Sequence, residues 1–570
     1  MGIRNVLLLF PALLAGCGDD NGNGDAGDVG DAAEADVAPE ADVEPDADAA
    51  DVPVEIEDAD GDGADAGPTV CEQLGLPARA WVEAPDDPSL FAVAADLTFE
   101  TLDDVWTLRD HWSGCETLMF VQDEPRQVDD WAGPLWGRDV RSLLSRSPRN
   151  THWFFVSTQV VGSTRLEALA ALQTEVETAL GGMSEEDRAW WSERVHYLPA
   201  RARDLPGWLG TLMNSPGWGV AVDRFQRLRF LGSYGDSGRY DAAHGWFRAN
   251  LAMAANEVRY YNFEAEREAR LAAEDAVVVR LFDGVAISDP GWTGTPGYAE
   301  VELPDAATMA GFDGLELDLT LACVGDGEYG DCPAWDYDVL LYLCDVAEPD
   351  RCDTWLGHWI TTYHRWGRWV HDVSGLLPLL ADGGTRRFAF YTTQEYEVTL
   401  DLRFLRRGDD TRPVEAHFLW GGGDFNADYD ALHPPVTVPV PADAVRVELA
   451  TVLTGHGGAD PGNCSEFCDM NHHFRVNGHD NVRRFPEAGT ESDCMSKVSE
   501  GTVPNQYGTW WYGRSGWCPG REVPLHVVDV TDQVVLGGDN TLEYTADYLG
   551  APYPGSGAHI RLSSWLIVRR

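Results

Sequence analysis

Carboxylates, a guanidinium, an imidazole and indole rings recur in four short motifs of the chain's second half. The motifs are Cys332-Pro-Ala-Trp335-Asp336-Tyr-Asp338, Thr454-Gly-His456-Gly, Cys464-Ser-Glu466-Phe-Cys468 and Arg514-Ser-Gly-Trp517-Cys518-Pro-Gly520. Carboxylates can accept or donate a proton in a reaction, and a guanidinium can stabilise developing negative charge. Indole rings have large apolar faces against which a sugar can stack. These residue types together indicate a site for acid–base chemistry.

Taken together, the four motifs resemble the peptide-N-glycosidase F family, bacterial amidases that remove N-glycans from asparagine. The resemblance covers about residues 276–570 and extends to two further stretches, Gly357-His-Trp-Ile360-Thr-Thr-Tyr363 and His371-Asp-Val373. It implies two side-by-side eight-stranded jelly rolls with the active site in the cleft between them. It also implies N-linked glycoproteins or glycopeptides as substrates, with no cofactor and no metal.

The resemblance assigns roles to single residues of this chain. The catalytic Asp of the family falls at Asp336, and the acid of its cysteine-bracketed loop falls at Glu466. We expect Asp336 to orient and deprotonate the water that attacks the asparagine side-chain amide. Glu466 and Arg514 are expected to position the first sugar and to stabilise developing charge. Trp335 and Trp517 are candidates for stacking on sugar faces.

Three positions depart from the family pattern. The family has an acid after a Tyr-Thr pair, where this chain has Thr393, and Glu395 lies two residues further on. Because residues two apart in a strand share a face, Glu395 is expected to present its carboxylate to the same cleft, displaced by ~7 Å. Tyr337 replaces an Arg that follows the catalytic Asp. His456 replaces a Trp and is kept as a candidate substrate-binding residue.

These departures leave alternatives to the amidase open. One is a surface lipoprotein that kept the fold, lost the activity and binds glycans or proteins. Another is a copper monooxygenase, a class whose core uses a similar pair of jelly rolls with several His ligands and a Met. The sequence contains no His-x-His, and its only adjacent histidines are His472 and His473.

The cysteines indicate an oxidising compartment. Of the 11 Cys, Cys17 stands apart in an N-terminal motif, which leaves an even number. An even set in an exported chain is typical of disulfides. Neighbours along the sequence predict the pairs Cys71–Cys115, Cys323–Cys332, Cys344–Cys352, Cys464–Cys468 and Cys494–Cys518. A Cys464–Cys468 bridge requires a tight loop with Glu466 at its middle. The alternative is a metal site at Cys464-x3-Cys468-x3-His472, which has ligand-like spacing.

The N-terminus resembles a bacterial lipoprotein signal. Arg4 precedes an apolar run from Val6 to Ala15, which is too short to span a bilayer and suits a signal-peptide core. The run ends in Leu14-Ala15-Gly16-Cys17, similar to the site at which cleavage before a Cys leaves that Cys lipidated. We therefore expect residues 1–16 to be removed and the protein to be anchored by lipid alone in the bacterial cell envelope, at the outer membrane or cell surface. An ordinary signal peptide with a chance Cys is the alternative.

The net charge of −54 is unevenly distributed. Residues 18–70 hold 19 of the 95 acidic residues and no Lys, Arg or His. Such a segment cannot bury enough apolar surface to offset its ordering entropy, so residues 17–70 are expected to form a disordered tether. A calcium site at Asp58-Ala-Asp60-Gly-Asp62 is the alternative, although its spacing departs from the helix-loop-helix pattern. The acidic balance argues against a nucleic-acid partner, and we expect a monomer.

Hydrophobic patterns predict the elements that position the motifs. Residues 71–272 have the pattern strand, helix, strand, helix, strand, which predicts an α/β domain of unknown role with parallel pairing, and the arrangement resembles the thioredoxin-like fold. Within it, a capping box at Thr164-x-x-Glu167 is expected to open a helix, and residues 240–273 are expected to form one long amphipathic helix. Short alternating strands after Val277 predict β-sandwich or jelly-roll domains at 273–432 and 433–570, so the fold class is mainly β. The family resemblance implies that both are antiparallel jelly rolls.

Overall fold

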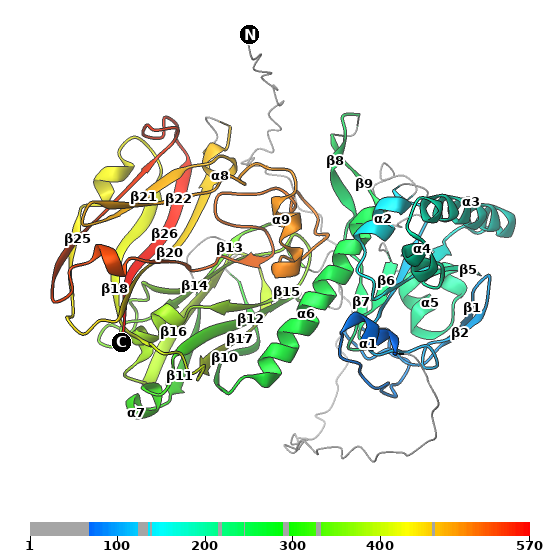
Figure 1. The fold of residues 1–570 in the computed structure, drawn as a ribbon, viewed down its shortest axis with the longest axis horizontal. Helices are drawn as coiled ribbons and strands as arrows, with labels where there is room; N and C mark the ends of the chain where they lie inside the picture. Colours follow the sequence, from blue (N-terminus) through cyan, green and yellow to red (C-terminus); the bar gives the residue numbers. More distant parts are fainter. Residues whose placement is uncertain are drawn as a thin grey trace, which may run out of the picture. The chain divides into compact units, whose positions relative to one another are not determined.

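The computed structural model describes residues 68–570, apart from 124–134, 137–138, 215–218, 244, 289–295, 326–331 and 459–461. Thr69–Arg570 forms a single unit (Figure 1). The expected signal peptide at 1–16, Cys17, the Asp58–Asp62 stretch and nearly all of the expected tether lie outside the described residues. Among the helices that are described, none combines the length and apolarity needed to cross a membrane.

The first part of the unit is an α/β body. Its helices are α1 (Val70–Leu74), α2 (Val140–Arg146), α3 (Gly162–Gly181), α4 (Glu185–Ser192), α5 (Gly207–Met213) and α6 (Ala255–Ala273). Its strands are β1 (Thr98–Glu100), β2 (Val105–Thr107), β3 (Thr117–Gln122), β4 (Thr151–Ser157), β5 (Val195–Arg201), β6 (Gly219–Val222), β7 (Leu228–Phe230), β8 (Gly235–Asp241) and β9 (Trp246–Ala249).

The central sheet of this body has the order β5-β4-β3-β6-β7. β4 pairs in parallel with both β3 and β5, which confirms the expected parallel pairing. Every residue of β3 and β4 is buried, as expected for strands covered on both faces. β6 and β7 extend the sheet with antiparallel pairing. The thioredoxin-like assignment stays a prediction.

Two local expectations in this body are wrong. α3 begins at Gly162, so Thr164 lies inside its first turn and does not cap it. The expected helix over 240–273 begins only at Ala255, because β8 and β9 form a hairpin before it. Gly245 at φ +69° permits the chain to turn, and the rings of Tyr240 and Phe247 pack together across the two strands.

The remainder of the unit is built from antiparallel sheets, which confirms the mainly β fold class. In the first pair of sheets, one has the order β10 (Ala276–Ile287), β17 (Tyr396–Leu405), β12 (Gly314–Ala322), β15 (Gly367–Asp372). The other has the order β11 (Gly297–Leu303), β16 (Gly384–Thr392), β13 (Asp338–Leu343), β14 (Thr354–Ile360), β23 (Arg521–Glu522). Their buried side chains belong to one core, which includes Leu317, Leu341 and Leu400.

A second pair of sheets follows. One has the order β18 (Pro413–Asp424), β26 (Ala558–Arg569), β20 (Arg446–Gly457), β24 (His526–Asp529). The other has the order β19 (Val436–Val440), β25 (Gly538–Asp547), β21 (Asn471–Val476), β22 (His479–Arg484). Phe474, Tyr544 and Leu566 share their core. The jelly-roll connectivity of the two sandwiches stays a prediction.

Strand pairing places the division between the sandwiches earlier than the expected boundary at 432–433. β18 ends before that boundary, yet it pairs along its length with β26, near the C-terminus. The second sandwich therefore begins at Pro413. In the opposite direction, β23 comes from the second half of the chain and pairs with β14 of the first sandwich. A strand from the second half of the chain thus joins a sheet of the first sandwich, directly after the motif that ends at Gly520.

Candidate active site

Asp336 lies in the segment that leads into β13, and the neighbouring strand fixes its backbone. The hydroxyl of Thr361, just after β14, donates to the carbonyl of Trp335 at 2.6 Å and accepts from the backbone N–H of Tyr337 at 2.8 Å. The backbone N–H of Thr361 donates to the carbonyl of Tyr337 at 2.9 Å. The peptide units on both sides of Asp336 are therefore held, and its carboxylate has a defined direction.

Glu466 is positioned by a single helical turn that a disulfide closes. Helix α8 (Cys464–Phe467) is bounded by the bridged Cys464 and Cys468, whose Cα atoms lie 4.7 Å apart. This is the tight loop that the sequence predicted. A Cβ added to Gly455 of β20 would lie 2.1 Å from the carbonyl oxygen of Ser465, so only glycine allows β20 to approach this turn so closely.

Arg514 joins the two carboxylates. Its Nη2 lies 3.3 Å from a carboxylate oxygen of Asp336, and its Nε lies 3.1 Å from one of Glu466. Nη1 donates to the backbone carbonyls of Thr509 and Tyr512. The arginine is only 2% exposed. The prediction that it contacts substrate therefore needs correction, because a buried guanidinium with these partners orients Asp336 and Glu466 instead.

Tyr363 completes this group, although sequence reasoning assigned no role to it. Its hydroxyl accepts from Nη2 of Arg514 at 3.3 Å and donates to the carboxylate of Asp336. Burial and the nearby Asp336 raise the pKa of Tyr363 well above its ordinary value, so the hydroxyl keeps its proton. Asp336 thus receives one hydrogen bond from a neutral donor and one from a cation.

The two carboxylates share the single positive charge of Arg514, and burial raises the pKa of both. Burial raises the pKa of Asp336, and the charge of Arg514 only partly opposes the effect. Burial also raises the pKa of Glu466 to about 7; the charge of Asp336 adds to this rise, and Arg514 opposes it. Burial disfavours the charge of Arg514, but Tyr363, Asp336 and Glu466 raise its pKa and keep it protonated. At neutral pH the pair can therefore hold a proton.

A second carboxylate, Asp338, lies two residues after Asp336 in a contrasting environment. It accepts from Nε2 of His358 at 2.7 Å and from Nε of Arg561 at 2.7 Å, while Nε2 of His456 lies 3.6 Å away. Burial opposes its ionisation, but His456, His358 and Arg561 together hold the pKa of Asp338 far below its ordinary value. Burial lowers the pKa of His456 to about 4, so this imidazole is neutral at pH 7.

A cavity of about 660 Å³ opens beside these groups. Along β13 the odd-numbered residues are buried in the core, so Asp338, Leu340 and Tyr342 project from the opposite face into the cavity. Its other lining residues are Asp336, Tyr337, Cys352, Asp353, Tyr391, Thr392, Thr393, His456 and Arg561. The volume lies within the range of small-molecule sites, and carboxylates and tyrosines dominate its polar lining.

The remaining sequence-predicted binding residues have different surroundings. Trp517 is 6% exposed; its Nε1 donates to the carbonyl of Gly455, and its ring stacks on His456 with centroids 5.1 Å apart. The Trp517 ring also lies 4.8 Å from the guanidinium carbon of Arg514. This indole supports the site from within the core and is not a sugar platform. Trp335 is 54% exposed and stays available for stacking.

Glu395 does not replace the acid that is absent at position 393. β16 ends at Thr392 and β17 starts at Tyr396, so Glu395 lies in the connection between them. The argument that residues two apart share a face applies only inside a strand. Glu395 is exposed and is not among the residues that line the cavity, whereas Thr393 is. The expected catalytic role of Glu395 is therefore corrected.

The structure confirms all five disulfide pairs, including Cys464–Cys468. The alternative metal site at that motif fails, because the sulfurs are joined and Nδ1 of His472 lies 2.9 Å from the hydroxyl of Tyr544.

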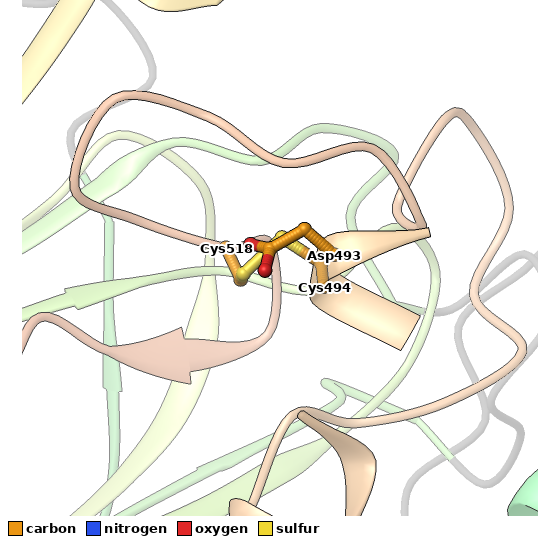
Figure 2. Close-up of side chains that lie close together, drawn as sticks. All are labelled: Asp493, Cys494 and Cys518. Carbon is orange, nitrogen blue, oxygen red and sulfur yellow. A yellow bond between two sulfur atoms is a disulfide. The ribbon is translucent and has the colours of Figure 1, made fainter. Parts of the chain in front are cut away.

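Figure 2 shows Asp493 beside Cys494 and Cys518, the one group of potential metal ligands found among the described residues. There, too, the sulfurs form a disulfide and Asp493 accepts from Lys497, so this group braces the segment that carries Trp517.

Sequence reasoning missed His358, Tyr363 and Arg561. The first two lie in the stretch Gly357–Tyr363, which carried part of the family resemblance and so held a usable signal. Arg561 gave none, because it is one polar position in the alternating strand β26 and reaches Asp338 from the other sandwich. Only the three-dimensional pairing of the sandwiches reveals that contact.

Comparison with known proteins supports the resemblance. Residues 424–567 match the family model described as "Peptide-N-glycosidase F, C terminal". The chain is 26% identical over 238 residues to peptide-N(4)-(N-acetyl-beta-D-glucosaminyl)asparagine amidase F of Elizabethkingia miricola, and the match covers 37% of this chain. It spans 63% of that relative's length, just under two thirds.

Solved structures of similar proteins include PNGase F from Flavobacterium meningosepticum, at 16% identity and a TM-score of 0.41, covering 52% of this chain and 96% of the other. Another is PNGF-II, at 11% identity and a TM-score of 0.40, covering 53% of this chain and 67% of the other. The family model over residues 424–567 and the curated relative, together with the motifs, support a relationship of the chain's second half to the peptide-N-glycosidase F family.

Proposed function

We propose that the protein is an amidase that hydrolyses the bond between asparagine and the first N-acetylglucosamine of N-glycoproteins. The observation that carries the proposal is the arrangement of the half-buried Asp336 and Glu466 around the buried Arg514, with Asp336 lining the cavity. Two carboxylates that compete for one cation can divide the roles of base and acid between them. The family relationship supports the choice of an asparagine-linked glycan as substrate.

In the proposed reaction, ionised Asp336 orients a water in the cavity and takes its proton as the water attacks the amide carbon. Asp336 lines the cavity, and Tyr363 and Arg514 direct its carboxylate. The C–O bond forms as the C–N bond breaks, so the asparagine becomes aspartic acid and the sugar departs as an amine. The raised pKa of Asp336 makes it a stronger base than an ordinary aspartate.

Glu466 supplies the proton that the departing amine needs. With a pKa of about 7, a substantial fraction of this carboxyl is protonated at neutral pH. Transfer of its proton to the amide nitrogen neutralises the leaving group. Because Asp336 takes one proton from the water, the two carboxylates together hold the same number of protons as before. Arg514 stays charged throughout and limits the build-up of negative charge between the two carboxylates.

The cavity along β13 provides the contacts for the glycan. Asp338 and Arg561 present charged hydrogen-bonding groups, and the rings of Tyr342 and Tyr391 pack against each other edge to face with centroids 5.6 Å apart. Tyrosines combine an apolar face with a hydroxyl, which suits the alternating apolar and polar surfaces of sugars. We propose that the first sugars lie over this face while the peptide stays outside.

The test is incubation of the purified protein with a denatured N-glycoprotein in ¹⁸O-labelled water. The expected result is free glycan together with conversion of the glycosylated Asn to Asp that carries one ¹⁸O atom, detected by mass spectrometry. Asp336→Asn should abolish release, while the same change at the exposed Asp532 serves as the matched control and should leave it intact. Absence of release by the wild-type protein, or full release by Asp336→Asn, would overturn the mechanism.

A second candidate is a binding protein on the same fold. It is favoured by the exposure of Glu395 and by Thr393 lining the cavity, because together they leave no acid at that position. The same samples distinguish the two functions. A protein that retains glycopeptides on a column but neither releases glycan nor incorporates ¹⁸O supports the binding protein.

We further propose that the protein is exported and anchored in the cell envelope by lipid on Cys17. The support is the run from Val6 to Ala15 followed by Gly16-Cys17, together with five disulfides that suit an oxidising compartment. Expression in bacteria with a labelled fatty acid should label the wild-type protein and not Cys17→Ser. Equal labelling of both forms would contradict the assignment.

A further inference from the structure

We propose that the α/β body takes part in building the catalytic site, and that Glu257 of α6 is the residue through which it positions Asp336. The inference rests on the proposed amidase function for its kinetic readout and gives the α/β body, whose role the sequence left unknown, a specific task. Glu257 belongs to the long green helix in Figure 1, outside both β sandwiches.

Glu257 is a fully buried carboxylate whose partners come from both parts of the unit. Its Oε1 accepts from Nη1 of Arg365 at 3.1 Å and from Nδ2 of Asn505 at 3.0 Å. It also accepts from the backbone N–H of Gly232 at 2.9 Å, within the α/β body. Glu257 and Asn505 are 0% exposed, and Arg365 is 2% exposed. One carboxylate thus joins three segments that are far apart in the sequence.

The first of these segments leads directly to Asp336. Arg365 follows Tyr363, whose hydroxyl donates to Asp336, and Thr361, whose side chain holds the peptide units flanking Asp336. Displacement of Arg365 therefore moves both contacts that orient the proposed base. Because an error of ~1 Å in a reacting group can cost a factor of 10², anchoring this segment matters for the rate.

The second segment, residues 503–506, links Arg365 to the part of the chain that follows Trp517. Arg365 donates to the carbonyl of Pro504 at 2.6 Å, beside Asn505. The next residue, Gln506, accepts from the backbone N–H of Tyr363 and donates to the carbonyl of Pro519. Residues 503–506 therefore connect α6 to the chain that follows Trp517.

The α/β body also contacts the segment whose backbone binds Arg514. In the β8–β9 hairpin, Phe247 packs edge to face on Trp511, with ring centroids 5.2 Å apart. The next residue, Tyr512, offers its carbonyl to Nη1 of Arg514 at 3.0 Å. A Cβ on Gly235 of the hairpin would come within 3.3 Å of the Trp511 ring, so the hairpin lies directly on this segment.

The ion pair between Glu257 and Arg365 allows the role of Glu257 to be tested by a substitution that removes its charge. Glu257→Gln keeps the shape of the side chain and an acceptor oxygen but removes the negative charge that Glu257 places beside the buried Arg365. Removing one member of a buried ion pair is far more disruptive than removing an exposed charge. Glu266→Gln, at an exposed position of the same helix, is the matched control.

The experiment compares wild type, Glu257→Gln and Glu266→Gln by steady-state kinetics and by hydrogen exchange. For Glu257→Gln we expect kcat to fall about 10-fold to 100-fold with KM within about twofold of wild type. Backbone exchange should quicken at 361–365 and 503–506. Glu266→Gln should match wild type in both measurements. If Glu257→Gln does not fold, Arg365→Lys keeps the charge but loses the guanidinium fork, and the same changes are expected.

The outcomes separate this inference from the proposed function. A folded Glu257→Gln protein with wild-type kcat and wild-type exchange overturns the role of Glu257 and leaves the amidase intact. Reduced stability with unchanged kcat of the folded protein also overturns it, because that result describes a purely structural residue. If the wild-type protein releases no glycan, the proposed function fails, and exchange at 361–365 alone decides whether Glu257 holds the segment beside Asp336.

Discussion

Asp336 and Asp338 are separated by one residue, line the same cavity and have opposite electrostatics. Asp336 shares Arg514 with a second carboxylate, and its pKa is raised. Asp338 receives hydrogen bonds from His358 and Arg561, and its pKa is held far below its ordinary value. The partners that surround each carboxylate, and not the residue type, separate a group that can exchange a proton from one that stays charged.

The comparison also distinguishes what each group can do in a reaction. A permanently ionised Asp338 can fix Arg561 across the two sandwiches, but it is too weak a base for proton transfer at neutral pH. Asp336 and Glu466 form a coupled pair, so a proton gained by one favours ionisation of the other. We therefore expect catalysis to depend on the pair around Arg514, and substrate affinity to depend on the group around Asp338.

The largest expected effect comes from changing the two aspartates separately. Asp336→Asn should lower kcat by about 10³-fold or more, because it removes the proposed base. Asp338→Asn should change kcat by less than about 10-fold and act mainly on KM. Initial rates of glycan release from a fluorescent glycopeptide give both constants. Equal losses of kcat in the two variants would remove the distinction between the two carboxylates.

Removing the shared cation should be the next largest change. Arg514→Met removes the buried cation that Asp336 and Glu466 share, and we expect the free energy of unfolding to fall by about 3–5 kcal/mol. Urea unfolding at pH 7 measures this change. Because protonation relieves the repulsion, the loss should be smaller at pH 5. Arg561→Met, which removes a more exposed arginine, is the comparison and should cost much less.

Glu466 should determine the pH dependence of the rate. Its pKa of about 7 means that the proton it donates is lost as the pH rises through 7, so kcat of the wild type should fall on the alkaline side. Glu466→Gln should lower kcat by about 10²-fold and remove this decline. Rates measured from pH 5 to 9 test the assignment. An unchanged alkaline decline in the variant would assign it to another group.

Sequence reasoning identified Asp336, Glu466 and the disulfides because each belongs to a short motif with fixed spacing. It failed for Glu395 because the end of β16 at Thr392 could not be located within three residues, and strand alternation was applied beyond it. It assigned Arg514 and Trp517 to substrate because motifs reveal proximity to a site but not depth of burial. Arg561 and Glu257 were invisible, since their partners lie 223 and 108 residues away in the sequence.

Acid should change the contributions of Glu466 and Asp338 to the stability of the folded protein in opposite directions. The folded-state pKa of Glu466 is raised, so its contribution is fully present below its unfolded pKa of ~4.3 and is lost as the pH rises through about 7. The folded-state pKa of Asp338 is lowered, so its contribution is present above ~3.9 and is lost as the pH falls below that value.

Urea midpoints measured from pH 3 to 8 should reveal both effects. Glu466→Gln should gain stability relative to wild type as the pH rises from 4 to 8. Asp338→Asn should be less stable than wild type by about 1.5–3 kcal/mol at pH 7, and the difference should shrink below pH 4. Differences that do not depend on pH in either variant would show that the two carboxylates titrate alike.

The smallest expected effect concerns the guanidinium that Asp338 holds. Arg561 lines the cavity with a side chain that is 39% exposed, so Arg561→Lys keeps the charge beside Asp338 while removing the planar fork of donors. We expect KM for a glycopeptide to rise about threefold, equivalent to ~0.65 kcal/mol, with kcat unchanged. Arg446→Lys, at an exposed position of β20 outside the cavity, is the control and should leave both constants unchanged. If kcat fell as far in Arg561→Lys as in Glu466→Gln, the group around Asp338 would take part in the chemical step. The cavity could then no longer be divided into a pair of carboxylates that exchanges protons and a carboxylate that stays charged.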